Sequence, residues 1–468
     1  MLDLILRGAR VVDPLNGIDA VMDVAVADGK IQAVAEKITE PAKETLDFSG
    51  CVLQPGIIDS HVHLGTMWGS AYGPKMLAMN GVTTCLDMAG PLYDVLDNVP
   101  EYGAGINMAI LQFASPPFTF KNNHPTKEEM VELIDKSLKD GALGVKLLGG
   151  HYPLTPEVSS LLIKTALERR AYVAWHAGTS EHGSNIEGMI EAVTMADGHP
   201  MHLAHINAYC RGAIKNELEE AKIAVELLEK NPNVFCESYI SPKNGTRLTC
   251  DENGKIQSKV TGNCLRHFGF SEDKEGVKGA LLAGKAFVVY DAGGYSDLMT
   301  GPEAVKRWEE AGTDVGGSFN INPPIPRVQL AELKRKDGGF VVDAISTDGG
   351  CIPRNVIISQ GLSLVKLDVL TLPEFVQKTS LNPARMLRLK QKGHLTPGAD
   401  ADITIYDFER QVPIASFVEG RKVLFEGKVV GKSATVICTE KGKEAIEARG
   451  LKAIVVDPGL PYERMKAL

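Results

Sequence analysis

The stretch GIIDSHVHL, residues 56–64, is the part of the sequence that decides how the rest is interpreted. It is rich in apolar residues, begins at the glycine of the Pro55-Gly56 pair and is typical of a short strand. Side chains two residues apart in a strand share a face, so His61 and His63 would present both rings on one side. Two imidazoles on one face can chelate a zinc-like ion. Because the motif is also common by chance, two ordinary polar residues at a strand end are an equally simple interpretation.

From residue 57 onwards, short apolar strands alternate with helical stretches, which is the pattern of β/α units around a parallel sheet. We predict eight strands, near residues 57–63, 82–88, 106–113, 142–148, 171–176, 201–206, 233–240 and 341–347. Helices are predicted between them, for example over 126–139, 155–169, 184–195 and 214–229. Thr126 and Glu129 form a capping-box pattern at the start of the first. Eight such repeats predict an α/β (β/α)₈ barrel, a TIM barrel, with its active site at the C-terminal strand ends.

Both ends of the chain carry a β pattern of a different kind. Strands are predicted at residues 3–12, 22–28 and 30–35, with an Asp28-Gly29 turn between the last two. After about residue 385 strands return at 401–407 and 421–427, and we expect the last strands to pair with the first fifty residues. The predicted domains are therefore a β-domain of residues 1–55 and 386–468, and a barrel of residues 56–385.

Residues 241–339 are too many for an ordinary connection within a barrel. We interpret them as an insertion over the barrel mouth, acting as a lid or a specificity element. The run AFVVY at 286–290 is typical of another strand, which leaves the position of the seventh barrel strand open.

Composition excludes several classes of protein. The 468 residues are 44% hydrophobic, enough for a large core, and the net charge of −9 argues against nucleic-acid or anionic-membrane partners. The N-terminus lacks the pattern of a signal peptide, and we find no apolar run of about 18 residues. The eight cysteines form no Cys-x-x-Cys pair, which favours reduced thiols and a cytoplasmic protein. We expect a small-molecule substrate.

Residues able to bind a metal stand at other predicted strand ends as well. Lys146 lies inside an apolar strand, where a lysine is costly unless it is neutralised or paired. His176, His205 and Asp348 each end a strand where a loop begins. A single histidine in such a place is usually structural. Six residues at five strand ends of one proposed barrel are hard to explain by coincidence.

With these residues in place, the sequence resembles the amidohydrolase superfamily, in the group of dihydroorotases, hydantoinases and N-acyl-D-amino-acid deacylases. The resemblance covers nearly the whole chain. It is carried by the GARVVD opening at 8–13, GIIDSHVH at 56–63, GVTT at 81–84 and the tail GHLTPGADADI at 393–403. That tail is typical of the composite β-sandwich of the superfamily. These motifs are specific for the superfamily and say little about the substrate.

The resemblance implies a role for each of the six residues. His61 and His63, with Asp348, would bind one divalent ion, and His176 and His205 a second, most simply zinc. Lys146 would be carboxylated by CO₂ and bridge the ions, because an ordinary ammonium there would repel them. A hydroxide between the ions would be the nucleophile, with Asp348 as general base and then general acid.

Substrate contacts are less clearly indicated. His151 and Tyr152 follow the lysine strand, Asn207 and Arg211 follow the sixth strand, and Arg354 follows Asp348. Each is explained as well by an ordinary loop or surface position.

The segments 238–246 and 348–354 resemble the deacylase branch, which often uses a cysteine ligand near strand two. Cys85 lies mid-strand, so we expect a core cysteine instead. His202 is out of register with His205, so we expect it to face the helices.

These observations favour a binuclear metallohydrolase acting on carbon–nitrogen bonds other than peptide bonds: an amide, a cyclic amide or a ureido group. Two alternatives stay within enzymes: an N-acyl-D-amino-acid deacylase specifically, or a deaminase of the superfamily, which would commonly use one metal and lack the lysine. A third is a non-catalytic binding or assembly relative. Relatives are usually dimers or tetramers, so a homo-oligomer is expected.

Overall fold

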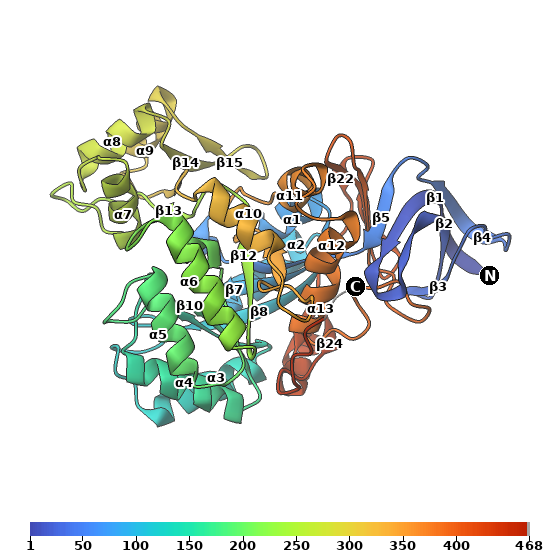
Figure 1. The fold of residues 1–468 in the computed structure, drawn as a ribbon, viewed down its shortest axis with the longest axis horizontal. Coiled ribbons are helices and arrows are strands. Elements are labelled where there is room, and N and C mark those ends of the chain that lie inside the picture. Colours follow the sequence, from blue (N-terminus) through green and yellow to red (C-terminus); the bar gives the residue numbers. More distant parts are fainter. Residues whose placement is uncertain (466–468) are drawn as a thin grey trace.

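A computed structural model describes residues 1–465 of the chain, and Figure 1 shows its arrangement. Sequence-distant strands at the two ends of the chain form one sheet, in the order β22-β21-β20-β19-β5-β1-β2-β3, with β4 beside β1. Its strands are β1 (Leu2–Asp13), β2 (Ile18–Ala27), β3 (Lys30–Ala35), β4 (Ala42–Asp47), β5 (Val52–Pro55), β19 (Ile403–Asp407), β20 (Val412–Val418), β21 (Arg421–Phe425) and β22 (Lys428–Val429). The antiparallel pairing of β5 with β19 joins the two halves.

A second sheet carries the site residues, and its pairings along the order β17-β12-β11-β10-β9-β8-β7-β6-β18 are parallel. Its strands are β6 (Ile57–His63), β7 (Val82–Ala89), β8 (Asn107–Ala114), β9 (Gly144–Leu148), β10 (Tyr172–His176), β11 (Met201–Leu203), β12 (Val234–Tyr239), β17 (Ala344–Ser346) and β18 (Gly349–Gly350). Each of the eight predicted strands has its counterpart here.

The parallel sheet curls so that its two ends meet. β17 pairs with β12, whereas β18 pairs with β6 at the other end of the order. Only Thr347 and Asp348 separate β17 from β18, and the backbone N–H of Asp348 donates to the carbonyl of His61 at 2.9 Å. One continuous segment therefore joins the last strand to the first.

Helices between the strands cover the outside of this sheet (Figure 1). They are α1 (Gly73–Met79), α2 (Leu92–Tyr102), α3 (Lys127–Lys139), α4 (Pro156–Glu168), α5 (Ile186–Ala196), α6 (Glu217–Lys230), α10 (Pro324–Glu332), α11 (Ile357–Lys366), α12 (Leu372–Val376) and α13 (Asn382–Met386). α3 begins at the predicted capping box of Thr126 and Glu129 and buries Met130 and Ile134 in the same cluster as Val145 of β9. Burying such a side chain contributes about 1.5–3 kcal/mol. The predicted α/β class is confirmed.

The insertion has a fold of its own. β13 (Thr246–Arg247), β14 (Ala286–Asp291), β15 (Ser296–Met299) and β16 (Gly316–Phe319) form an antiparallel sheet. With α7 (Lys259–His267), α8 (Lys274–Leu282) and α9 (Pro302–Glu310) it encloses a separate core around the fully buried Trp308. The run at 286–290 is thus a strand of this sheet, which leaves β12 as the seventh strand of the parallel sheet.

The last part of the chain returns to the parallel sheet. β23 (Thr435–Cys438) pairs with the first residues of β8, and β24 (Lys452–Val455) pairs with β23 after α14 (Lys443–Ala448). These two strands therefore do not join the N-terminal sheet, unlike β19 to β22. Within residues 1–465, none of the helices has the length and apolar character needed to cross a membrane.

Candidate metal centre

His61, His63 and Asp348 form one compact group at the joined edge of the curled sheet. One ligand atom from each lies within 4.8 Å of the others. Oδ1 of Asp348 lies 2.9 Å from Nε2 of His63 and 3.3 Å from Nε2 of His61. The spacing of the two histidines on β6, and the pairing of β6 with β18, place all three side chains together. Two imidazoles and a carboxylate are a common donor set for zinc.

A buried carboxylate that the sequence analysis did not single out contacts His61 through Nδ1, the ring nitrogen that does not face Asp348. Glu237 on β12 is fully buried, and its Oε1 lies 2.6 Å from Nδ1 of His61. Ser346 on β17 donates its hydroxyl to the other oxygen of Glu237. Burial, and then the nearby charge of Lys146, lower the pKa of His61 well below its usual value, so the ring is neutral at pH 7. A neutral imidazole is the form that binds a metal.

His176 and His205 form a second group on the adjacent strands. Nδ1 of His176 and Nε2 of His205 face each other at 2.9 Å. Ser184 lies 2.8 Å from the other nitrogen of His176, and the His205 ring stacks on His61 with centroids 5.0 Å apart. The two histidine groups are thus adjacent.

Lys146 lies in the middle of β9 with its side chain fully buried, and its Nζ is 2.9 Å from the sulfur of Met88. Burial lowers the pKa of Lys146 to about 7, despite the opposing charges of Glu237 and Asp348. Near pH 7 about half of this lysine is therefore in the neutral amine form. Its side chain lines the same cavity as the histidines.

Two of the predicted ligands have strained backbones. Asp348 has a φ of 50° and His205 a φ of 68°, the left-handed region that L-residues rarely occupy. Such conformations cost about 1–3 kcal/mol and concentrate at functional sites. Arg354 holds Asp348 in place: its Nη2 lies 2.7 Å from Oδ2, and its Nε donates to the Asp348 carbonyl at 2.5 Å. Burial raises the pKa of Asp348, but the charges of Arg354 and His63 outweigh it and leave the pKa below its usual value.

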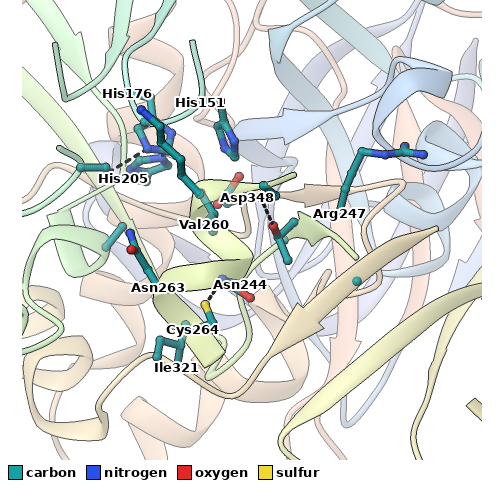
Figure 2. A pocket seen from close by; sticks show the side chains of 18 of the residues that line it. His151, His176, His205, Asn244, Arg247, Val260, Asn263, Cys264, Ile321 and Asp348 are labelled. Carbon is teal, nitrogen blue, oxygen red and sulfur yellow. Dashed lines mark hydrogen bonds between the residues drawn. The ribbon is translucent and has the colours of Figure 1, made fainter. Parts of the chain in front are cut away.

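These residues open into a cavity of about 990 Å³ between the parallel sheet and the insertion. Figure 2 shows His151, His176, His205 and Asp348 around one hollow, with Asn263 and Ile321 of the insertion below them. Trp68 adds an aromatic wall, its ring 5.2 Å from His63 and 6.3 Å from His151.

The predicted substrate contacts divide into two groups. His151, Tyr152, Arg211 and Arg354 line the cavity. Burial and the neighbouring His63 lower the pKa of His151 to about 4, so this ring is neutral. Within residues 1–465, Asn207 does not line the cavity. Its side-chain oxygen instead accepts hydrogen bonds from the Ser238 hydroxyl and from the backbone N–H of Tyr239, each at 3.0 Å.

Arg211 is positioned by both parts of the structure. Its Nε donates to Asn322 of the insertion at 2.7 Å and its Nη2 to the hydroxyl of Tyr239 at 2.8 Å. The carboxylate of the buried Glu220 accepts from the backbone of Gly212 and Ile214, which fixes the loop. Among the ion pairs found within residues 1–465, none includes Arg211.

The prediction for His202 is wrong. The ring is fully buried inside the curled sheet, where it accepts or donates a hydrogen bond with the Tyr172 hydroxyl at 2.9 Å and packs on Phe235. The alternation counted back from His205 fails because β11 ends at Leu203 and His205 has a left-handed backbone. Cys85 is fully buried in a hydrophobic cluster with Val62 and Leu77, as a core cysteine would be.

Comparison with known proteins adds an independent observation. A model of the amidohydrolase family matches residues 361–431. A dihydroorotase of Geobacter metallireducens is 27% identical over 444 residues, 87% of this chain and 90% of that protein. An allantoinase of Deinococcus radiodurans is also 27% identical, over 92% of this chain and 97% of its own length.

Over most of its length the chain is therefore similar to enzymes of the amidohydrolase superfamily. A solved D-aminoacylase mutant in complex with copper chloride shares the fold, with a TM-score of 0.66 over 94% of this chain and all of that one, at 18% identity. The predicted enzyme class, a hydrolase acting on carbon–nitrogen bonds other than peptide bonds, is confirmed at the level of this superfamily.

Proposed function

We propose that this amidohydrolase is a binuclear metal-dependent enzyme that hydrolyses a C–N bond in a small molecule, most simply a cyclic amide or ureide. The observation that carries the proposal is the convergence of six potential ligands, from five neighbouring strands or the residues directly after them, on one cavity. The full-length similarity to proteins named dihydroorotase and allantoinase supports a cyclic substrate.

We infer a closed (β/α)₈ barrel over residues 56–385, with the segment 344–350 completing it. Of the β-domain predicted at residues 1–55 and 386–468, we infer that β1–β5 and β19–β22 form the composite β-sandwich, because β23 pairs with β8 of the parallel sheet. Support comes from the pairing of β17 and β18 with opposite ends of the sheet order, and from the pairing of β5 with β19.

The donor atoms fit two divalent ions, with zinc as the simplest choice. Nε2 of His61 and His63 with Oδ1 of Asp348 would hold one ion. The facing nitrogens of His176 and His205 would hold the other. When bound, such ions polarise a carbonyl and lower the pKa of water to about 7.

Lys146 is suited to be a carboxylated bridging ligand. A neutral amine is the form that reacts with CO₂, and the only hydrogen-bond partner found for its Nζ within residues 1–465 is the sulfur of Met88. Carboxylation would turn a costly buried cation into an anion beside two cations.

Asp348 would transfer a proton from the attacking water to the leaving nitrogen. Its Oδ1 faces the histidines and the cavity, while Arg354 holds its Oδ2. Oδ1 can therefore accept a proton from the attacking water and deliver it to the leaving nitrogen.

Substrate binding would use the cavity walls. His151 and Tyr152, with Trp68, offer an aromatic side, and Arg211 offers a cation able to bind a carboxylate or a carbonyl. Arg354 lines the cavity while it is engaged by Asp348, and Asn207 supports Tyr239. N-acyl amino-acid deacylation is a second candidate, because a cavity of about 990 Å³ has room for an acyl chain beyond a ring.

The state of the cysteines bears on the compartment in which the protein works. All eight cysteines are free thiols, which supports a reducing, cytoplasmic environment. We propose a homo-oligomer with small-molecule substrates and no nucleic-acid or membrane partner.

The test is to remove metal, reconstitute the protein with Zn²⁺, count metal per chain and measure hydrolysis of matched substrate panels. We expect two metal equivalents and turnover of hydantoins, dihydropyrimidines or cyclic ureides above N-acyl amino acids. One equivalent with release of ammonia would favour a deaminase. Absence of bound metal would contradict the proposal.

A further inference from the structure

Glu237 is a buried acidic residue to which none of the proposed catalytic roles applies. Its side chain is fully buried on β12 and reaches across the inside of the sheet to β6 and β17. One oxygen lies 2.6 Å from Nδ1 of His61, and the other accepts from the hydroxyl of Ser346. A buried carboxylate is costly unless such partners hold it, so this arrangement is specific rather than incidental.

The contact fixes which nitrogen of His61 is available. His61 has one nitrogen against Glu237 and the other, Nε2, 3.3 Å from Asp348, inside the three-residue group. The proton of the hydrogen bond between Nδ1 and Glu237 belongs to one partner or the other, depending on the tautomer of His61. With that proton on Nδ1, the lone pair of Nε2 points at the position of the ion.

The neighbouring histidine lacks this support. Nδ1 of His63 is buried and has no hydrogen-bond partner within residues 1–465. The ring of His63 is also more exposed, at 12%, against 1% for His61. Of the two histidines on β6, His61 is therefore the one whose Nδ1 has a partner in the protein.

We propose that Glu237 is a positioning residue that holds His61 through Nδ1, so that Nε2 faces the metal site together with His63 and Asp348. Ser346 completes the arrangement by fixing the rotamer of Glu237. The inference rests on the proposed function, because it concerns the affinity of that site for its metal. Loss of such a partner typically lowers metal affinity by about 10–100-fold.

The test compares Zn²⁺ affinity with stability in the full-length protein. Apo wild type, Glu237→Met and Glu237→Gln are titrated with Zn²⁺ against a chromophoric chelator, and the urea midpoint of each apo protein is measured in parallel. We expect the dissociation constant of the tighter Zn²⁺ to rise about 10–100-fold in Glu237→Met. Glu237→Gln, which keeps an acceptor for Nδ1, should recover part of that loss.

A matched control comes from the same buried region. Tyr172→Phe removes a hydroxyl that bonds His202, which lies 3.9 Å from Glu237, without touching His61 or His63. We expect unchanged Zn²⁺ affinity in this variant. An equal loss in Tyr172→Phe would make the effect a general disturbance of the core and overturn the inference.

The other outcomes distinguish a failure of the Glu237 role from a failure of the proposed function. Wild-type affinity in Glu237→Met, or in Glu237→Gln alone if the methionine variant does not fold, overturns the role of Glu237 and leaves the proposed function intact. Wild type that binds no Zn²⁺ overturns both. Ser346→Ala should give a smaller loss than Glu237→Met, because the carboxylate remains but can rotate.

Discussion

Arg354 and Asp348 form a buried pair in which the guanidinium binds both the side chain and the main chain of the same residue. Its Nη2 lies 2.7 Å from Oδ2 and its Nε donates to the carbonyl at 2.5 Å. Nη1 reaches the carbonyl of Lys243, and the group lies 5.0 Å over the ring of Tyr239. Because Asp348 has a left-handed backbone, these contacts hold the proposed general base where relaxation would otherwise move it.

Arg354→Met should therefore destabilise the apo protein. Removing one member of a buried ion pair costs about 3–5 kcal/mol, since the other charge stays buried. Arg354→Lys should recover little, because an ammonium cannot bind the carboxylate and the carbonyl in the same fork. The measurement is the free energy of unfolding in urea; a loss below about 1 kcal/mol in Arg354→Met would show that the pair contributes no more than a surface bridge.

Lys146→Met should reduce bound metal from two equivalents per chain to one or none and abolish turnover, without lowering the stability of the apo protein. The substitution removes a ligand, and it also removes a lysine whose charge is costly in the core. Metal analysis and urea unfolding of the same preparations check both parts.

Lys378 supplies the matched control. It is equally buried, and burial likewise lowers its pKa to about 7, but its Nζ donates to the carbonyl of Val342 at 2.6 Å. It is not among the described residues that line the cavity. Lys378→Met should keep two metal equivalents. If Lys146→Met also kept two, the bridging role would be wrong.

The strands, and most of the residues that meet in the cavity, could be predicted because they follow local rules. Apolar runs bounded by Gly and Pro mark the strands, and the C-terminal ends of parallel strands meet at one edge of a sheet. His61, His176 and Asp348 therefore converge although they are far apart in the sequence.

Glu237 could not be assigned in the same way. Glu237 lies 176 residues from His61 in the sequence. The one available signal was an acidic residue inside the apolar strand VFCESY, and that pattern does not indicate which residue the carboxylate contacts. His202 was misplaced because the regular alternation of β11 stops before His205. The pairing of β23 with β8 also depends on tertiary packing, which strand propensity does not encode.

Arg211→Met should raise KM for carboxylate-bearing substrates about tenfold or more and change KM little for uncharged analogues. A charge-assisted hydrogen bond contributes about 1.5–3 kcal/mol, and the guanidinium already has a fixed direction from Asn322 and Tyr239. Metal content should not change. Steady-state kinetics on a charged and an uncharged substrate check this, and an equal rise in KM for both would assign Arg211 to the shape of the cavity instead.

Lys392→Met should lower stability most near neutral pH. Lys392 is buried, at 2% exposure, between Asp402 at 2.6 Å and Asp400 at 2.9 Å, and Asn107 at the start of β8 also donates to Asp402. Burial lowers the pKa of Lys392, but the two carboxylates outweigh it and raise the pKa above 10.5. Burial raises the pKa of Asp400, but Lys392 and Lys30 outweigh it and lower the pKa below 3.8.

The sign of the pH dependence follows from these shifts. The stability that Asp400 contributes is present above its unfolded pKa of 3.8 and is lost as pH falls through the lower folded value. The contribution of Lys392 is present below 10.5 and is lost as pH rises through the higher folded value. Between about pH 5 and 9 both contributions are complete, so Lys392→Met should cost about 3–5 kcal/mol there, and less towards pH 3. Urea unfolding at pH 7, 5 and 3 measures the difference from wild type; a difference that stays constant across this range would mean that Lys392 acts through packing alone.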